Sequence, residues 1–269
     1  MIGPTVVVGT YGQVFAPVPR IIHQTWKSDE IPDEWKPYQH SWRHAHPGWE
    51  YKLWTDEANR RLVADRYPWF LPTYDAFPRD IQRVDAAKYL IVYTYGGVYA
   101  DLDCECLKPL DPLTSRGGAV VSLTRDRVVD CAVFASPAGH ALWGVVLRRM
   151  QWPALFARLL WHVPGCRASH VLFTTGTQMF KHAVGAYLAS ASAPAADGIT
   201  VCDAALLSSR SWLDRYQRFD EPEAFVCHHY ADSWLRPAEQ RVHVWLTRRT
   251  GWVLLGLVLL VVLGTAVRC

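Results

Sequence analysis

The stretch from residue 80 to residue 103 constrains the fold more than any other part of the chain. Apolar side chains recur at the spacing of a helix over residues 80–95, with Pro78 just before them and Gly96 and Gly97 just after. A proline starts a helix readily, and a pair of glycines ends one. We therefore predict a helix over residues 80–95 that stops abruptly.

Beyond the glycines, apolar and polar residues alternate, which predicts a strand whose polar face carries Tyr99, Asp101 and Asp103. Two carboxylates this close repel each other unless a cation neutralises them or one stays protonated. Oxygen ligands suit Mg²⁺ or Mn²⁺, which complete their coordination shell with water and substrate phosphates. The alternative for an Asp-x-Asp tripeptide is a solvated loop at the end of a strand.

Composition sets the class of protein independently. A chain of 269 residues with 50% hydrophobic content can bury one sizeable α/β core. The net charge of +3 is spread without any long Lys/Arg run, which argues against a nucleic-acid partner. The cysteines form no CxxC pair, so no disulfide framework or zinc site is legible. Cys104 and Cys106 could form a ligand pair, but a buried apolar role is favoured.

Strands and helices alternate along the rest of the domain, as in a doubly wound sheet. Bounding polar and proline residues predict strands over residues 20–26 and 51–54, and Thr55 is placed to cap a following helix. Two more strands are predicted over residues 119–123 and 128–135, followed by a helix over residues 141–150. Residues 32–47 are predicted to be a helix with exposed histidines at positions 40, 44 and 46 rather than a metal site.

Several segments together resemble glycosyltransferase family 32, the sugar-binding DXD group that includes outer-chain α-mannosyltransferases and mannosyl-inositol-phosphoceramide synthases. The similar segments run in the same order from residue 19 to residue 234, and they are PRIIHQTWK, WEYKLWTD, the Asp-x-Asp stretch, SPAGH, LFTTG and HHYADSW. The resemblance implies a GT-A fold (a Rossmann-like nucleotide-diphospho-sugar transferase domain), a nucleotide-sugar donor, a divalent metal, Mn²⁺ or Mg²⁺, and retention of anomeric configuration.

The resemblance also assigns candidate site residues. Asp103 is expected as the principal metal ligand, with Asp101 as its partner that also reaches the donor; both are the catalytic candidates. Tyr99, on the same predicted face, is a further donor-site candidate. Trp26 is a candidate for stacking on the donor base, against the alternative of a core tryptophan.

Within the predicted helix, Asp85 and Lys88 lie three residues apart and share a face. The family has Asp-x-x-Arg here, with both residues contacting the donor's sugar and ribose. The ammonium of Lys88 keeps the charge but lacks the bidentate fork of arginine. An exposed ion pair is the alternative.

A second group of site candidates lies near residue 230. The resemblance suggests a late histidine as a further metal ligand and a Ser and a Trp at the diphosphate, which implies His228, Ser233 and Trp234. Adjacent histidines point opposite ways in an extended segment, so only one of His228 and His229 is expected to bind the metal.

These features predict a metal-dependent retaining glycosyltransferase that moves a hexose, with mannose from GDP-mannose preferred, to a hydroxyl of a lipid or glycan, such as inositol phosphoceramide. Three departures from the family pattern motivate an alternative: Lys88, Asp130 in place of an Asn, and Thr177 in place of a proline. The alternative is a membrane-anchored protein that binds carbohydrate or a nucleotide sugar with little catalysis.

The last strong signal is an uncharged apolar run over residues 251–267, flanked by Arg248, Arg249 and Arg268. A helix of this length spans about 26 Å, close to the hydrocarbon thickness of a bilayer. We predict an N-terminal extension over residues 1–18, a catalytic domain over residues 19–240 and a single-pass C-terminal anchor in an endomembrane, Golgi-like, or a viral host membrane. The flanking arginines favour a cytosolic domain, whereas Golgi relatives imply a lumenal one, so the side stays open. A buried core helix is the alternative for this run.

Overall fold

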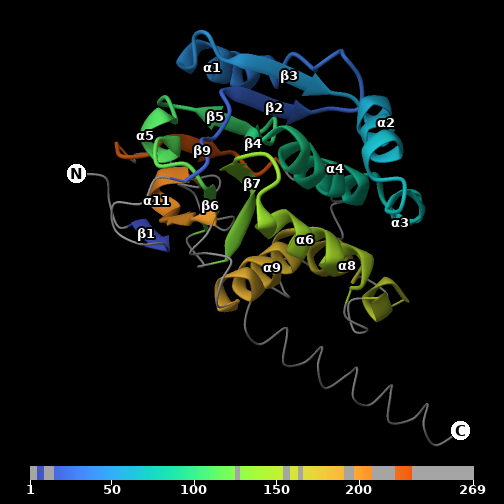
Figure 1. Ribbon diagram of the computed structural model, residues 1–269. Coiled ribbons are helices and arrows are strands. Elements are labelled where there is room, and N and C mark those ends of the chain that lie inside the picture. Colours follow the sequence, from blue (N-terminus) through green and yellow to red (C-terminus); the bar gives the residue numbers. More distant parts are fainter. Residues whose placement is uncertain are drawn as a thin grey trace, which may run out of the picture.

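The computed structural model describes the chain in seven ranges, which are residues 5–8, 15–124, 128–153, 158–162, 166–190, 197–207 and 222–231. These ranges form a mixed α/β arrangement in which helices cover both faces of a central sheet (Figure 1). The α/β class predicted from the sequence is confirmed. The Ser233 and Trp234 candidates and the run over residues 251–267 lie outside the described residues.

The strands are β1 (Thr5–Val8), β2 (Ile21–Thr25), β3 (Glu50–Trp54), β4 (Gly97–Ala100), β5 (Cys104–Cys106), β6 (Ala119–Leu123), β7 (Val129–Ser136), β8 (Ile199–Cys202) and β9 (Val226–His228). The helices are α1 (Lys36–Ala45), α2 (Asp56–Arg66), α3 (Leu71–Asp75), α4 (Asp80–Tyr95), α5 (Asp111–Thr114), α6 (Ala141–Gln151), η1 (Leu160–His162), α8 (Arg167–Thr174), α9 (Thr177–Ala189) and α11 (Ala204–Leu207).

The central sheet has the strand order β1-β8-β6-β7-β4-β2-β3. Strand β2 runs parallel to both β3 and β4, whereas β4 pairs antiparallel with β7. Strand β1, from the predicted N-terminal extension, pairs with β8 at one edge. A separate two-stranded sheet joins β5 to β9, which brings the Asp-x-Asp region against a segment more than 100 residues later.

Helix α4 has the predicted bounds and ends because of Gly96 and Gly97. Both glycines have positive φ, at 66° and 96°, which side chains rarely adopt. A Cβ on Gly96 would lie 2.6 Å from the backbone nitrogen of Ala138, and one on Gly97 would lie 2.5 Å from the carbonyl oxygen of Ile21. The two glycines therefore allow α4 to turn directly into β4 at the centre of the sheet.

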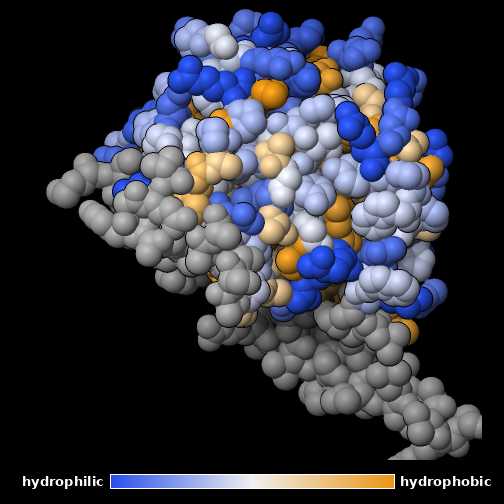
Figure 2. All heavy atoms as spheres, viewed as in Figure 1, coloured by the Kyte–Doolittle hydropathy of each residue, from blue (hydrophilic) through white to orange (hydrophobic). Residues whose placement is uncertain are grey.

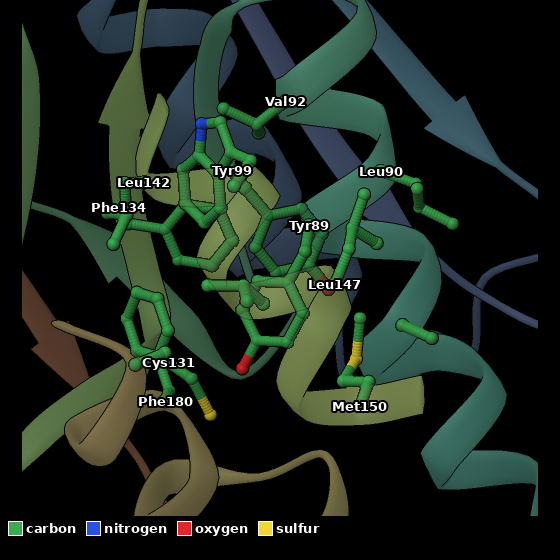
Figure 3. Packing of buried hydrophobic residues seen from close by; sticks show 14 of the residues in the cluster. Tyr89, Leu90, Val92, Tyr99, Cys131, Phe134, Leu142, Leu147, Met150 and Phe180 are labelled. Carbon is green, nitrogen blue, oxygen red and sulfur yellow. The ribbon is translucent and has the colours of Figure 1, made fainter. Parts of the chain in front are cut away.

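Each face of the sheet carries its own hydrophobic core. One core, shown in part in Figure 3, packs Tyr89 of α4 against Phe134 of β7 and Phe180 of α9, with ring centroids 5.6 and 5.2 Å from that of Tyr89. The other core includes Val98 and Ala100 of β4 together with side chains of α1, α5, α11, β5 and β9. Successive residues of β4 thus face opposite cores, and Tyr99 belongs with α4.

Most predicted elements agree with the structure. The strands predicted near residues 20, 51, 119 and 128 and the helix predicted at residue 141 correspond to β2, β3, β6, β7 and α6. The hydroxyl of Thr55 accepts a hydrogen bond from the backbone nitrogen of Ala58 at 3.1 Å, so this residue caps α2 as predicted. The six cysteines in the described ranges are buried and form no disulfide with one another, which agrees with the lack of a disulfide framework in the sequence.

Two local predictions are wrong. The strand after the glycines ends at Ala100, and Asp101 to Asp103 form a turn closed by a hydrogen bond from the Cys104 nitrogen to the Asp101 carbonyl. His46 is buried rather than exposed, because it lies just past the end of α1 and its Nε2 accepts a hydrogen bond from the Leu110 nitrogen at 2.9 Å. His40 and His44 are exposed as predicted.

The described surface is mostly hydrophilic, with hydrophobic residues in small separate patches in the view of Figure 2. Its most exposed large apolar side chain is that of Trp152, at the end of α6. Within the described ranges, no helix is long and apolar enough to cross a membrane.

Candidate active site beyond the central strand

Two of the predicted site residues in the described ranges lie where parallel strands β2 and β4 end. Because these strands are parallel, their carboxyl ends meet at one edge of the sheet. Trp26 directly follows β2, and Asp101 directly follows β4. Crevices outside the carboxyl ends of strands are where open α/β sheets bind ligands.

Asp101 is held in place by its neighbours on three elements. Its backbone nitrogen donates to the carbonyl of Ala132 at 2.8 Å, and its Oδ1 accepts a hydrogen bond from the Tyr99 hydroxyl, also at 2.8 Å. The Thr25 hydroxyl lies 2.8 Å from that of Tyr99 and can donate to it. Burial raises the pKa of Asp101 to about 6, against the opposing effect of Lys88 and with a further increase from Asp103. Tyr99 therefore acts on Asp101 as a positioning group.

Asp85 and Lys88 form a buried ion pair rather than the exposed one considered from the sequence. Lys88 Nζ lies 2.8 Å from Asp85 Oδ1 and 3.9 Å from Asp101 Oδ1, and the side chains of Lys88 and Asp85 are 3% and 6% exposed. The Thr175 hydroxyl donates to the other oxygen of Asp85 at 2.9 Å. Burial works to lower the pKa of Lys88, but Asp101 and Asp85 hold it well above the ordinary value. Lys88 is therefore a buried cation between two carboxylates.

Asp103 meets His228 across the small sheet. The pairing of Cys104 with His228 in β5 and β9 places His228 Nε2 at 3.4 Å from Asp103 Oδ2. The same carboxylate oxygen accepts a hydrogen bond from the Ala231 nitrogen at 3.0 Å. Burial works to raise the pKa of Asp103, but His228 and the Ala231 amide together lower it below the ordinary value. The structure thus brings together two of the three predicted metal-binding side chains.

The two adjacent histidines point to different partners. Nε2 of His229 lies 3.0 Å from Glu105 Oε2, and its ring stacks on Tyr38 with centroids 4.4 Å apart. His228 instead lies between Asp103 and Asp130, with Nδ1 at 3.6 Å from Asp130 Oδ2. Sequence reasoning left the role of Asp130 open, and no motif pointed to its proximity to His228.

The chemistry of these side chains fits a divalent cation. Carboxylates of Asp101, Asp103 and Asp130 lie around Lys88 and His228, and Lys88 is already paired with Asp85. Burial works to lower the pKa of His228, but Asp103 and Asp130 hold it well above the ordinary value. Even with the imidazole protonated, negative charge exceeds positive charge at the site, which a divalent ion would balance. Ligand atoms of Asp103, Cys104 and His228 lie within 4.8 Å of one another.

Cys104 is a poor member of such a site. Burial, with added repulsion from Asp103 and Asp101, raises the pKa of the Cys104 thiol well above its ordinary value. A thiol binds metal as the thiolate, and hard oxygen donors suit Mg²⁺ and Mn²⁺ better than sulfur. The buried apolar role favoured for this residue therefore agrees with its surroundings.

Trp26 lies at the same edge of the sheet and is partly buried. Its Nε1 is buried and has no hydrogen-bond partner in the described part of the chain. The Trp35 ring lies 6.5 Å away, and Lys27 Nζ lies 5.7 Å from the Trp26 ring centroid. The Trp26 ring is therefore not enclosed in the main core. Its role in stacking on the donor base stays a prediction.

A mixed sheet with an acidic, metal-fitting site beyond its parallel strands defines an α/β ligand-binding protein. Comparison with known proteins identifies a family within this class. Residues 32–117 match the family described as glycosyltransferase sugar-binding region containing DXD motif. Inositol phosphoceramide mannosyltransferase 1 of Schizosaccharomyces pombe is 30% identical over 240 residues, which cover 88% of this chain and 68% of that protein. The chain belongs to this DXD glycosyltransferase family.

Other relatives match shorter segments at higher identity. Inositol phosphoceramide mannosyltransferase 3 of Schizosaccharomyces pombe is 52% identical over 103 residues, which cover 38% of this chain and 29% of that protein. Mannosyl phosphorylinositol ceramide synthase SUR1 of Saccharomyces cerevisiae is 46% identical over 96 residues, or 36% of this chain and 25% of that protein. These alignments thus span less than a third of the relatives' length. Among solved structures, PaToxG glycosyltransferase aligns over 62% of this chain and 68% of its own, with a TM-score of 0.44 and 14% identity.

Proposed function

We propose that this protein is a metal-dependent retaining glycosyltransferase that transfers a hexose from a nucleotide sugar to a hydroxyl group. The observation that carries the proposal is the contact of Asp103 with His228, beside Asp101, which lies next to the buried Lys88–Asp85 pair. Family members carry the DXD motif in their sugar-binding region. We assign the Asp103, Asp101 and His228 side chains to the cation, with Mn²⁺ preferred and Mg²⁺ as the alternative.

The preferred donor is GDP-mannose, and the preferred acceptor is a lipid such as inositol phosphoceramide, with a glycan hydroxyl as the alternative. The proposal rests on relatives named inositol phosphoceramide mannosyltransferase and mannosyl phosphorylinositol ceramide synthase. In this scheme Trp26 stacks on the donor base, and Asp85 and Lys88 border the donor sugar. Ser233 and Trp234, which lie outside the described residues, are proposed to contact the diphosphate.

The residues of the site have separate tasks in this mechanism. Tyr99 and Lys88 hold the carboxylate of Asp101 in a fixed orientation through contacts of 2.8 and 3.9 Å. Asp103, Asp101 and His228 would hold the cation, which would supply positive charge against the diphosphate leaving group. The acceptor hydroxyl attacks the anomeric carbon from the face that the diphosphate leaves, and a phosphate oxygen takes the hydroxyl proton. Configuration is thereby retained without a side chain as general base.

A donor screen tests the proposal. Purified full-length protein in detergent with Mn²⁺ is incubated with GDP-mannose, UDP-glucose, UDP-galactose or UDP-N-acetylglucosamine, and release of nucleoside diphosphate is measured. We expect turnover with at least one donor, GDP-mannose foremost. Asp103→Asn should lower kcat/KM at least about 100-fold, which corresponds to about 2.7 kcal/mol. Glu105→Gln, which removes a carboxylate paired with His229 instead, should retain activity.

The result also separates an enzyme from a binding protein. Binding of a nucleotide sugar in calorimetry without turnover for any donor would favour the catalytically weak binding protein. Activity that survives Asp103→Asn or removal of metal by chelation would contradict the metal role of the site. The thermal unfolding midpoint of each variant shows whether a loss of activity reflects unfolding.

A further inference from the structure

His228 lies between two carboxylates, and only one of them belongs to the DXD motif. Its Nε2 faces Asp103 Oδ2 at 3.4 Å, and its Nδ1 faces Asp130 Oδ2 at 3.6 Å. The Nδ1 atom is buried and has no hydrogen-bond partner within the described ranges, because its distance of 3.6 Å from Asp130 Oδ2 is beyond the usual range. A histidine that binds a metal through one ring nitrogen almost always donates the proton of the other to a carboxylate, a carbonyl or water. Asp130 is in place to accept that proton.

An irregularity between β6 and β7 accounts for the position of Asp130. Val121 pairs with Phe134, but the next residue, Ser122, pairs with Asp130, so extra residues of β7 lie opposite a single step of β6. Such bulges redirect side chains and occur often beside active sites. Asp130 is buried, and its Oδ1 accepts a hydrogen bond from the Ala132 nitrogen at 3.0 Å. Its second oxygen is thereby directed toward His228.

The contacts of the bulge also reach the DXD motif. The carbonyl of Ala132 accepts the hydrogen bond from the Asp101 nitrogen, and Cys131 Sγ lies 3.5 Å from Lys88 Nζ. One short segment of β7 therefore borders Asp101 and Lys88 on one side and His228 on the other. Asp130 is the residue of this segment that carries a carboxylate.

We propose that Asp130 is a positioning residue that orients His228 toward the cation. The inference rests on the proposed function, because it takes His228 as a metal ligand. In this arrangement Nδ1–H of His228 donates to Asp130 Oδ2, which fixes the tautomer and leaves the Nε2 lone pair directed to the side of Asp103. A small rotation of the ring closes the present distance of 3.6 Å to that of a hydrogen bond. Asp130 acts through His228 and does not bind the cation itself.

Mn²⁺ binding without substrate tests this role. The signal of free Mn²⁺ in electron paramagnetic resonance is followed as full-length protein is titrated. Asp130→Asn keeps the shape of the side chain and an oxygen for the Ala132 nitrogen, and it should weaken Mn²⁺ binding about 10- to 100-fold. The matched control is Glu105→Gln, which removes a partly exposed carboxylate of β5 that pairs with His229, and it should leave the dissociation constant within about twofold.

A double-mutant cycle separates orientation of His228 from a general effect of negative charge. His228→Gln alone should weaken Mn²⁺ binding, and adding Asp130→Asn to it should cost less than about twofold more, since the residue through which Asp130 acts is gone. Full additivity would overturn the inference, as would an Asp130→Asn variant that binds Mn²⁺ like the unaltered protein. If Asp130→Asn fails to fold, Asp130→Ser provides the same comparison at lower side-chain volume.

The outcomes for the two proposals differ. An unaltered protein that binds no Mn²⁺ overturns the metal-dependent function and this inference together. An unaltered protein that binds Mn²⁺, with an unchanged affinity in Asp130→Asn, overturns only the role of Asp130. Three results together support the role of Asp130. Asp130→Asn binds Mn²⁺ weakly, Glu105→Gln binds it normally, and the double variant of His228→Gln and Asp130→Asn shows no further loss.

Discussion

Lys88 is the residue on which the charge balance of the site depends most. It is buried between Asp85 and Asp101, so Lys88→Met would leave two carboxylates without their cation. Breaking a buried ion pair from one side costs about 3–5 kcal/mol. We expect the free energy of unfolding to fall by that amount in urea titrations. Combining Lys88→Met with Asp85→Asn should recover part of the loss, and a loss below about 1 kcal/mol for Lys88→Met alone would contradict this account.

Single residues of the site differ in how far the sequence could predict them. Asp85, Lys88, Asp101 and Asp103 lie close together along the chain, so the spacing of helix and strand was enough to group them. Asp130 could not be grouped with His228, because its direction depends on a bulge that is defined by pairing with β6. Whether the grouped residues perform the assigned roles stays a prediction.

At the scale of elements, His23 connects three parts of the sheet region and makes their stability depend on pH. Its Nδ1 accepts a hydrogen bond from Trp54 Nε1 at 3.1 Å, and its Nε2 lies 2.9 Å from the Gly96 carbonyl, to which it donates. The contact with Trp54 requires the neutral ring, because a protonated Nδ1 cannot accept a hydrogen bond, whereas the contact with Gly96 is possible in both protonation states. Burial lowers the pKa of His23 to about 4, although the Gly96 carbonyl works in the other direction.

His23 therefore binds a proton only at lower pH in the folded state than in the unfolded state, where its pKa is near 6.5. The stability from this group is present in full above about pH 6.5 and is lost as pH falls toward 4, by about 3 kcal/mol in total. We expect the difference in unfolding free energy between the unaltered protein and His23→Gln to shrink over this range. A difference that stays constant from pH 7 to pH 4 would show that His23 titrates normally.

The elements themselves were predictable where local signals were strong. The bounds of α4 followed from apolar spacing and the two glycines, and Thr55 marked the start of α2. The end of β4 was missed because alternation continues past Ala100, while the hydrogen bond between Cys104 and Asp101 closes a turn there. His46 was missed because its burial depends on contact with the segment before α5.

At the scale of the whole molecule, the apolar run over residues 251–267 leads to a test of membrane attachment. We predict that removing residues 250–269 releases a soluble domain that remains active on a soluble acceptor. Activity on a lipid acceptor in vesicles should fall roughly 100-fold, because an anchor raises the effective concentration of enzyme at the surface. Partition into the membrane pellet after carbonate treatment gives the measurement.

Two results would contradict the anchor. Carbonate would release the full-length protein if this run were not inserted in the bilayer. A lower thermal unfolding midpoint after truncation would indicate a helix that belongs to the core of the domain. The matched comparison is the full-length protein in detergent, which holds the rest of the sequence constant.

The pairing of β5 with β9 has a consequence for the order of folding. Cys104 pairs with His228, so the strand that carries His228 closes a loop of more than 120 residues. Long loops carry a larger entropic cost of closure, and contacts between distant segments form slowly. During synthesis, the helix and strand that carry Asp85, Lys88 and Asp101 leave the ribosome long before β9 does. The nascent chain therefore holds an incomplete site through most of its translation, because His228 joins Asp103 only when β9 pairs with β5.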